Sequence, residues 1–523
     1  MHCVIGSGPA GVACAKALLA RSAGVLMLDA GIELEPGRAQ LVHQLSRTKF
    51  SGWNPSQLAA LKGDMEADSK GIPLKKIFGS DFPYRETVGK IPWRGHGIGL
   101  QPSLALGGLS NVWGAAMLPY RDEDISDWPV KNPELAPHYR AVAEITGLAA
   151  QRDDLEEIFP LHCENPHALN PSRQSEFLLR NLNRHREKLR GCGWLFGRAR
   201  LAVRAADSPR GIGCVHCGQC MTGCVYGCIY NSADTVRELL LQEKFKYQRD
   251  VIVTKLREES GKVLIEGFNR RTNAPLSFEA DRVYLASGVI PTAQILLRSQ
   301  NDYDHPLTLR DSQYFIFPIL LARRARGVQT EALYALSQLF IELNHPQISR
   351  RPVHLQIYSY SDIIGQAVQK SLGPLKMFAR QIEERLLVVQ GYLHSDESSA
   401  IEMTLKRDGE KDFLRLEAKL NPETRRVVKR ILRELLKQSR RIGGIAVQPM
   451  LQIGEPGRGF HSGGSFPMRE RPGKFESDCL GRPHGWSRVH AVDASVLPGV
   501  PATTITFSVM ANAHRIGLET ATF

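Results

Sequence analysis

The residues with the clearest chemical meaning stand at the N-terminus. Gly6-Ser7-Gly8-Pro9-Ala10-Gly11 is a G-x-G-x-x-G turn between an apolar pair and a helical pattern, Val12–Ala20. Its first glycine permits a tight turn, its second lets the backbone approach a pyrophosphate, and its third lets helix and strand pack closely. Asp29 ends the next apolar run, 18 residues beyond Gly11, where a carboxylate can accept from a ribose hydroxyl. This order predicts a bound dinucleotide with its phosphates at the helix N-terminus; the alternative is an ordinary glycine-rich loop.

A run of five cysteines is the second group that could do chemistry: Cys214, Cys217, Cys220, Cys224 and Cys228. The first four match the C-x2-C-x2-C-x3-C spacing of ferredoxin-type ligands, so one loop could wrap an iron–sulfur cluster. Against this, a valine follows the fourth cysteine where that pattern has proline, and no second run follows. We therefore favour a tight loop with cysteines as small buried residues, and keep a cluster, or zinc, as alternatives.

Length and charge limit the class of protein. At 523 residues, two lobes or one large α/β domain with insertions is expected. The formal net charge of +13 concerns solubility and attraction to anions rather than fold. Because no motif belongs to a nucleic-acid-binding module, we do not interpret this charge as DNA binding. A basic surface leaves peripheral contact with an anionic membrane, an acidic substrate or an acidic redox partner open.

The sequence also bears on location. The first strand pattern begins almost at Met1, which leaves no room for a signal peptide. No apolar run approaches the length of a membrane span, so no transmembrane segment is expected. Five of the ten cysteines crowd into 214–228, and the others are scattered. We therefore expect a cytoplasmic protein.

The elements that must position these groups read as a doubly wound sheet. Arg282–Gly288 is a second strand that runs into a glycine, and a helix follows from Thr292 to Ser299. Short strands are expected at 251–253, 262–265 and 276–280, and a last strand at 489–493 is followed by a turn and a helix that runs through Ala513. Repeated strand–glycine–helix units are what a sheet around a dinucleotide would contain.

The pattern changes between about 306 and 450. Val353, Leu355 and Ile357 alternate with His354 and Gln356, which predicts a half-buried strand. A helix is expected to begin at Asn421, with asparagine as the N-cap and proline at the first position. The side of this helix opposite its apolar stripe is basic and could contact a membrane or an acidic partner. We favour a surface helix packed on a sheet.

Taken together, the motifs resemble the glucose–methanol–choline (GMC) family of flavin oxidoreductases, over nearly the whole chain. Composition alone would make 106–116 a glycine-rich loop with a buried tryptophan, but it is similar to the family's flavin-covering loop. The segments that carry the resemblance are Gly6–Gly11 with Asp29, Gly107–Gly114, Asp127–Pro129, Leu285–Gly288 and Val492–Pro498. The resemblance implies FAD as cofactor. The cofactor-binding positions that it implies are Gly6, Gly8, Pro9, Ala10, Gly11, Asp29, Ala30, Gly107, Gly108, Ser110, Asn111, Val112, Ala286, Ser287, Gly288, Asp493, Ala494 and Thr503.

The same resemblance implies the catalytic groups. In the family, a histidine beside flavin N5 removes the hydroxyl proton while the adjacent hydride passes to N5. His461, in His-x-x-Gly-x-x-x-Met, occupies the matching position, and an imidazole suits proton transfer near neutral pH. Thr504 stands where the family usually has histidine or asparagine; its hydroxyl can hydrogen-bond a substrate oxygen but cannot act as a base.

These observations predict an α/β protein with two lobes. A Rossmann-like FAD-binding lobe would comprise 1–129, 196–305 and 451–523, and an α+β substrate lobe on an antiparallel sheet would comprise 130–195 and 306–450. The first hypothesis is an FAD-dependent enzyme that oxidises a CH–OH group of an alcohol or sugar-like substrate and passes electrons to an unidentified acceptor. The alternatives are a flavin-binding protein with weakened or lost alcohol chemistry, and electron transfer through a cluster at Cys214–Cys224.

Overall fold

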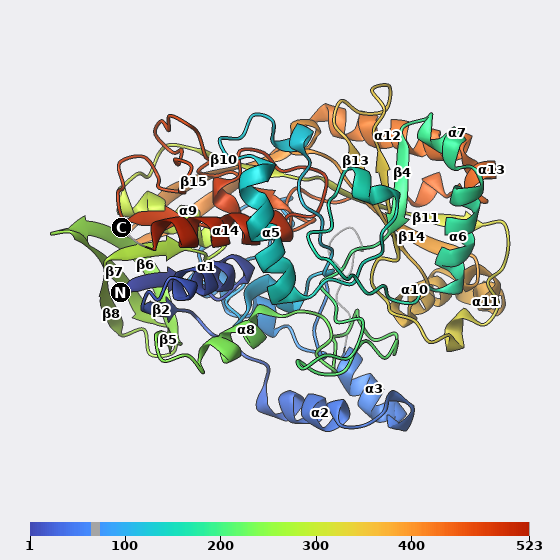
Figure 1. The fold of residues 1–523 in the computed structure, drawn as a ribbon, viewed down its shortest axis with the longest axis horizontal. Coiled ribbons are helices and arrows are strands. Elements are labelled where there is room, and N and C mark those ends of the chain that lie inside the picture. The colour runs from blue at the N-terminus through green and yellow to red at the C-terminus, as the bar shows by residue number, and fades with distance from the viewer. Residues whose placement is uncertain (64–73, 522–523) are drawn as a thin grey trace.

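A five-stranded parallel sheet carries the N-terminal turn in the computed structural model, which describes residues 1–63 and 74–521. Every neighbouring pair of its strands is parallel. Because the strands come from the beginning, middle and end of the chain, segments far apart in sequence form one surface (Figure 1). In order across the sheet they are β20 (Val489–Ala491), β9 (Arg282–Leu285), β1 (His2–Ile5), β2 (Val25–Leu28) and β5 (Phe245–Gln248).

Helices pack against this sheet and against one another. The first helix, α1 (Pro9–Ala20), lies beside the last, α14 (Thr506–Thr520), and α5 (Asn132–Thr146) crosses α14 (Figure 1). The α1–α14 contact is close, since a Cβ built on Gly517 would lie 2.8 Å from the Cys14 carbonyl oxygen. Further elements of this lobe are α8 (Ser232–Leu239), α9 (Val289–Ser299) and a three-stranded antiparallel sheet of β6 (Val251–Glu259), β7 (Lys262–Asn269) and β8 (Pro275–Ala280).

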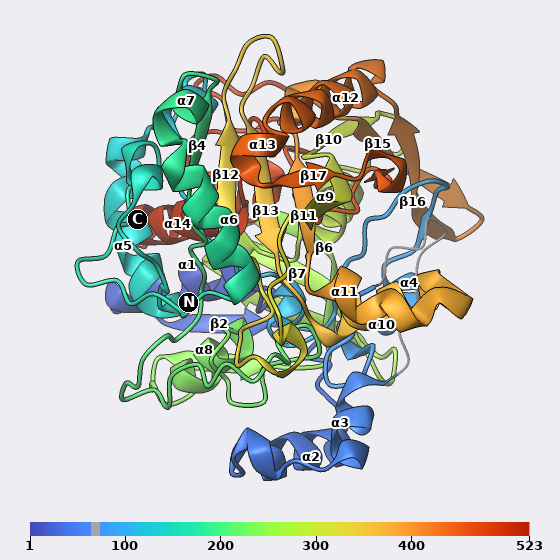
Figure 2. The same cartoon turned by 90° about the vertical axis from the view of Figure 1, so that its right-hand side faces the viewer.

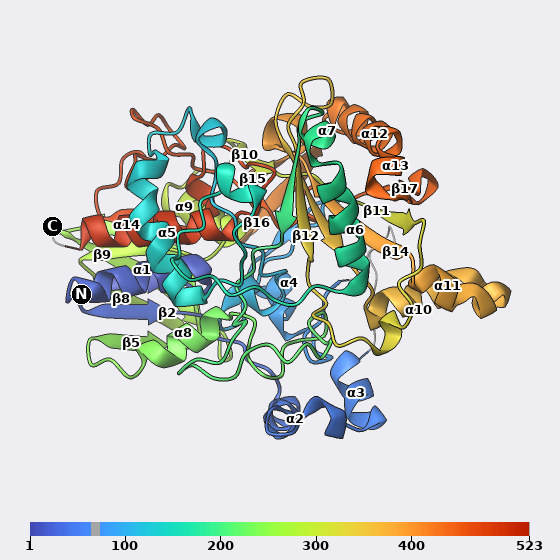
Figure 3. The same cartoon turned by 45° about the vertical axis from the view of Figure 1, so that its right-hand side comes forward.

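The second lobe contains a seven-stranded antiparallel sheet (Figure 3). Its order is β17–β11–β14–β13–β12–β4, and β18 also pairs with β11. The strands are β4 (Trp194–Arg198), β11 (Tyr314–Leu321), β12 (Leu339–Leu343), β13 (Val353–Tyr358), β14 (Leu386–Tyr392), β17 (Gly444–Ala446) and β18 (Gln452–Ile453). The predicted class, a Rossmann-like lobe joined to a lobe on an antiparallel sheet, is confirmed.

A layer of helices covers one face of this sheet (Figure 2). Leu178 and Leu182 of α6 (Arg173–Arg184) and Val427 and Ile431 of α12 (Pro422–Lys437) belong to the same buried cluster as the strands. The apolar face of α12 is therefore packed on the protein, as the favoured interpretation of this basic helix predicted. Two short helices, α7 (Arg186–Arg190) and α13 (Ser439–Ile442), complete the layer.

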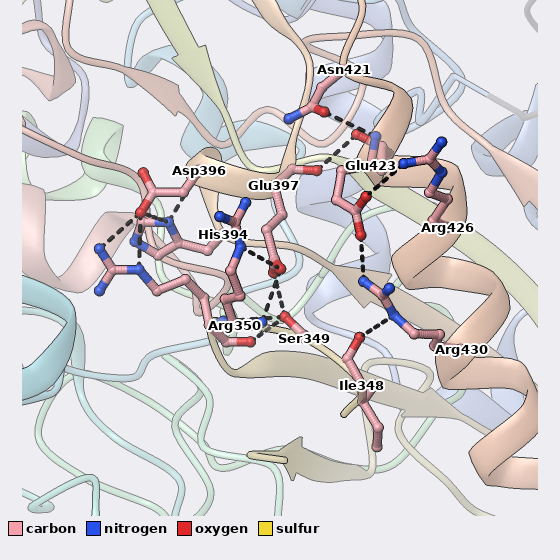
Figure 4. Close-up of polar contacts among 12 residues, drawn as sticks. Ile348, Ser349, Arg350, His394, Asp396, Glu397, Asn421, Glu423, Arg426 and Arg430 are labelled. Atoms are coloured by element: carbon pink, nitrogen blue, oxygen red, sulfur yellow. Dashed lines mark hydrogen bonds and ion pairs between the residues drawn. The ribbon is translucent and has the colours of Figure 1, made fainter. Parts of the chain in front are cut away.

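The N-terminus of α12 is fastened to two loops (Figure 4). The Asn421 side chain accepts from the Glu423 N–H at 2.9 Å, as predicted for an N-cap, and Glu423 pairs with Arg430 at 2.5 Å. Arg430 in turn donates to the Ile348 carbonyl at 2.7 Å. Beside it, the buried Glu397 carboxylate accepts from the Arg350 N–H at 2.9 Å and contacts the Ser349 hydroxyl. The helix thus holds the loop that leads into β13.

Strand β13 corrects one prediction. His354 and Gln356 are fully or almost fully buried, whereas the alternation had predicted a half-buried strand. The reason is that β13 lies inside the sheet, between β12 and β14, and that its polar face is turned toward a cavity and its apolar face toward the covering helices. An alternating pattern here marks two different buried environments rather than core and solvent.

A third sheet joins the lobes. Its order is β19 (Ser462–Gly463), β10 (Leu307–Asp311), β15 (Ala400–Asp408), β16 (Lys411–Lys419) and β3 (Trp93–Arg94). Strands from 306–450 therefore pair with strands from the segments assigned to the FAD lobe. The remaining helices include α2 (Pro36–Ser46), α3 (Pro55–Lys62), α4 (Thr87–Lys90), α10 (Asp362–Leu372) and α11 (Ala379–Glu383). None of the described helices is long and apolar enough to cross a membrane.

Candidate active site

The N-terminal glycine turn is shaped by contacts with the neighbouring strand and opens onto a large cavity. Gly6 has φ +104°, and a Cβ built on it would lie 2.5 Å from the Ala286 carbonyl oxygen. A Cβ on Gly11 would lie 2.0 Å from the Gly6 carbonyl oxygen, so both positions require glycine. Gly8 is different: no described atom lies within 4 Å of its built Cβ, and no side chain caps α1 there. Open space beside an uncapped helix N-terminus suits a phosphate.

Asp29 connects this turn to the loop at 107–112. Its buried carboxylate accepts from the Ser7 hydroxyl at 2.7 Å, the Ser7 N–H at 3.2 Å and the Tyr247 hydroxyl at 3.0 Å. The Ser7 hydroxyl oxygen also accepts from the Gly107 N–H at 2.9 Å. Burial raises the pKa of Asp29 to about 6, although these hydrogen bonds oppose the shift. Asp29 therefore holds two loops together while it lines the cavity.

The loop at 107–112 is closed by its own side chains. Ser110 donates to the Gly107 carbonyl at 2.6 Å, and the Asn111 amide donates to the Gly108 carbonyl at 2.7 Å. Asn231 holds the loop from behind by donating to the Asn111 side-chain oxygen at 2.8 Å. A Cβ on Gly108 would lie 3.3 Å from the Gly8 Cα. The two glycine segments thus meet backbone to backbone.

Asp493 organises the other wall. Its carboxylate accepts from the Gly288 N–H at 2.9 Å, the Thr292 hydroxyl at 2.6 Å and the Ser495 N–H at 2.9 Å. The first two bonds hold the N-terminus of α9, which follows β9 through Ala286, Ser287 and Gly288. Burial raises the pKa of Asp493 as well.

All these elements enclose one cavity of about 1440 Å³. Ligand sites of small molecules measure roughly 300–1,000 Å³, so this one can hold a cofactor together with a substrate. The structure places Gly11, Gly107, Asn111 and Thr503 behind the wall. The predicted site residues that line the cavity are Gly6, Gly8, Pro9, Ala10, Asp29, Ala30, Gly108, Ser110, Val112, Ala286, Ser287, Gly288, His461, Asp493, Ala494 and Thr504.

His461 lies in the turn that leads into β19. Its ring stacks on Tyr392, with centroids 4.7 Å apart and planes at 28°, and its Nδ1 is buried without a hydrogen-bond partner in the described part of the chain. Burial, with a smaller contribution from His354, lowers the pKa of His461 to about 3. The imidazole is therefore neutral near pH 7, so one of its ring nitrogens can accept a hydrogen bond from a substrate hydroxyl. The buried Thr504 hydroxyl oxygen accepts from the Leu118 N–H at 3.1 Å, which leaves its hydrogen available.

A polar network on β12 and β13 was not predicted. His354 pairs with Glu342 at 2.5 Å, Gln356 contacts His354 at 3.2 Å, and Tyr358 donates to Gln356 at 2.9 Å. Gln356, Tyr358 and Tyr392 all line the cavity. The available signal was the residue type, because His, Gln and Tyr, rather than Lys or Glu, occupied the polar positions of the strand.

The five cysteines surround a separate small pocket of about 20 Å³. Burial raises the pKa of the Cys217 thiol to about 11 and also raises that of Cys214 and Cys220. Hydrogen bonding by Cys228 lowers the pKa of Cys224. Within the residues that the structure describes, no group of three or more His, Cys, Asp or Glu side chains is placed to hold a metal ion. We therefore do not carry the cluster hypothesis further.

Comparison with known proteins places the fold. No family model matches the chain, and no curated protein matches it either. Among solved structures, 490 chains match. One of them is the structure of pyridoxine 4-oxidase from Mesorbium loti, with a TM-score of 0.60 and 15% sequence identity. The similarity covers 99% of this chain and 98% of that one. The chain thus shares the fold of that structure over nearly its whole length, and the predicted two-lobed fold class is confirmed.

Proposed function

We propose that this protein is an FAD-dependent oxidoreductase that oxidises a CH–OH group of a small-molecule alcohol or sugar-like substrate. The observation that carries the proposal is that the turn at Gly6 and Gly8, the turn at 286–288, the 107–112 loop and His461 all border one cavity. The likeness to a pyridoxine 4-oxidase supports the same class of reaction. Turnover would also require an electron acceptor.

The residues present fit the cofactor. Gly8 and the N-terminus of α1 would hold its pyrophosphate, Asp29 would accept from its ribose, and the backbone of Gly108 and Ala286 would border its planar parts. Bound FAD supplies the hydride acceptor for the oxidation. The protein supplies orientation and proton transfer.

His461 and Thr504 would act on the substrate hydroxyl. His461 would take the hydroxyl proton, and stacking on Tyr392 fixes the ring for that transfer. The Thr504 hydroxyl donates to the substrate oxygen, because its own oxygen already accepts from Leu118. Thr504 therefore orients the substrate, and His461 alone is the base.

His461→Ala tests this assignment, with the exposed His43→Ala as a matched control. We expect the His461 variant to retain the two flavin absorption bands but to bleach with an alcohol about 10²- to 10⁴-fold more slowly, which is the usual contribution of a general base. Bleaching at the rate of wild type would contradict the role of His461. If wild type itself is never bleached by a broad panel of alcohols, the protein is a flavin-binding protein without alcohol chemistry. A colourless protein that added FAD does not restore would contradict the cofactor.

A further inference from the structure

The cavity continues well beyond His461 along the inner face of the seven-stranded sheet. Tyr392, which stacks on His461, is followed on the same face of β14 by Gln390, Val388 and Leu386, and all four line the cavity. At about 3.3 Å per residue, this row extends roughly 20 Å from Tyr392. On the neighbouring strand, Ile316 pairs with Gln390, and Pro318 with Val388. The floor thus changes from polar beside His461 to apolar at its far end.

We call this extension of the cavity the arm, and helix α10 forms its other wall. Ile364, Val368 and Leu372 recur every four residues, so they share one face of the helix, and all three line the cavity. They are half-buried rather than buried, although they are large apolar residues of an amphipathic helix. An arm with apolar side chains on both walls suits an extended hydrocarbon and does not suit a sugar.

The arm opens at the surface beside α10. Gln366, Ala367 and Ser371 are exposed and also line the cavity. The helix and the following α11 project from the body of the protein, beyond β14 (Figures 2 and 3). Lys62 of α3 pairs with Asp362 at 2.6 Å, which ties the start of α10 to the rest of the protein.

The turn between α10 and α11 ends in an apolar tip, which we define as Met377 and Phe378. Met377 is 77% exposed and Phe378 is 45% exposed. Lys370 and Lys376 are exposed nearby, and the whole chain carries a net charge of +13. Adjacent apolar side chains with flanking lysines are typical of segments that enter the headgroup region of an anionic membrane.

We propose that the α10–α11 segment docks on an anionic lipid surface and that the arm receives the hydrocarbon part of an alcohol from that surface. This inference rests on the proposed function for the oxidation itself, and it narrows the substrate to an amphipathic alcohol with an apolar chain. The hydroxyl end would lie beside His461 and Thr504, and the chain would lie between β14 and α10. Charge complementarity favours lipid over a second copy of this basic chain.

Sedimentation with vesicles tests the docking surface without any turnover. Purified holoprotein is mixed with vesicles of phosphatidylcholine, or of phosphatidylcholine with one quarter phosphatidylserine. The tip variant Met377→Ser/Phe378→Ser is compared with Leu241→Ser/Leu420→Ser, which removes two leucines that are 89% and 76% exposed elsewhere. We expect binding to the anionic vesicles, a loss of about tenfold or more in the tip variant, and wild-type binding in the control.

Charge is tested separately with Lys370→Glu/Lys376→Glu, for which we expect about a 20-fold loss or more, since each lysine near an anionic surface contributes roughly fivefold. Equal sedimentation of wild type and the tip variant, or no sedimentation of wild type, would overturn the docking surface. Tip-dependent dimers in size-exclusion chromatography without vesicle binding would assign the tip to a second copy of the chain and would also overturn it. Flavin absorbance of each variant shows that it is folded.

The arm has its own test, a titration with a pyrene-labelled long-chain alcohol followed by fluorescence. We expect saturable binding that Val368→Asp weakens about tenfold and that the control leucine variant preserves. Equal binding by Val368→Asp would overturn the arm as the hydrocarbon site. Both tests measure binding alone, so loss of the proposed oxidation would leave their results intact, and a failure here would leave the flavin assignment standing.

Discussion

Gly8 is the position at which one methyl group is expected to disturb the cofactor and spare the fold. Its φ of −65° and ψ of 179° are accessible to alanine, and its built Cβ meets no described atom within 4 Å. Alanine in place of glycine at an N-cap costs about 1 kcal/mol or less. The methyl group would occupy the space through which a pyrophosphate approaches the backbone. One displaced hydrogen bond to a charged group costs about 1.5–3 kcal/mol, so we expect Gly8→Ala to weaken FAD binding about 10- to 150-fold.

Gly11→Ala is the matched variant with the opposite expectation. Helix propensity alone favours alanine over glycine by about 1 kcal/mol. The structure reverses this sign, because the new Cβ would lie 2.0 Å from the Gly6 carbonyl oxygen and the backbone would have to move. Overpacking of this kind costs about 1–3 kcal/mol, and the displaced turn also loses its contact with β9. We expect the free energy of unfolding to fall by about 2 kcal/mol or more.

The two variants are compared as deflavinated proteins in urea unfolding, and then by titration with FAD followed through flavin fluorescence. Gly8→Ala should unfold within about 1 kcal/mol of wild type yet bind FAD weakly. Gly11→Ala should unfold early. If Gly8→Ala binds FAD as tightly as wild type, the pyrophosphate does not lie over Gly8 and the reasoning from the open space there fails.

Two further predictions concern the buried carboxylates. Burial raises the pKa of Asp29 from 3.8 to about 6. The folded state therefore holds this proton more tightly than the unfolded state does. The resulting stability is present below pH 4 and is lost as the pH rises to about 6. We therefore expect the free energy of unfolding of wild type to fall across this window by about 3 kcal/mol relative to Asp29→Asn, measured by urea unfolding of the deflavinated proteins, and parallel pH profiles would contradict the burial argument. Asp493→Ala leaves the donors of Gly288, Thr292 and Ser495 without their acceptor, so we expect the free energy of unfolding to fall by about 3 kcal/mol or more in the same assay. Asp493→Asn keeps an acceptor and should lose less. Equal losses in the two variants would show that these hydrogen bonds do not stabilise the fold.

The parts of the fold that were predictable are those encoded by neighbouring residues. The strand, turn and helix at 2–20 follow from apolar runs around glycines, and the start of α12 follows from Asn421 and proline at the next position. The burial of β13 did not follow, because it depends on which strands lie on either side and on a cavity opposite. This error comes from contacts between distant segments.

The candidate site shows the same division. Motif positions identified the cavity wall, but they did not distinguish residues that face it from residues that support it. The Asn111 side-chain amide donates to the Leu106 and Gly108 carbonyls, and Gly107 packs against Asn231. Ser7 and Tyr247 donate to Asp29 and hold it in place, but no motif spacing predicts this role for either residue. Their function is visible only once β2 and β5 stand side by side.

The two acidic residues of the motifs bear on why this architecture persists at 15% identity. Asp29 and Asp493 each accept three hydrogen bonds from the protein itself, and in both cases these bonds fix a glycine-containing turn. Their first role is therefore to shape backbone, and the surface that remains for a cofactor at these turns is largely peptide groups and open space above Gly8. Backbone groups are the same in every residue type, so such a site places demands on few side chains and leaves the rest of the sequence free to change. The seven-stranded sheet and α10 carry no such constraint, and it is there that the substrate would be selected.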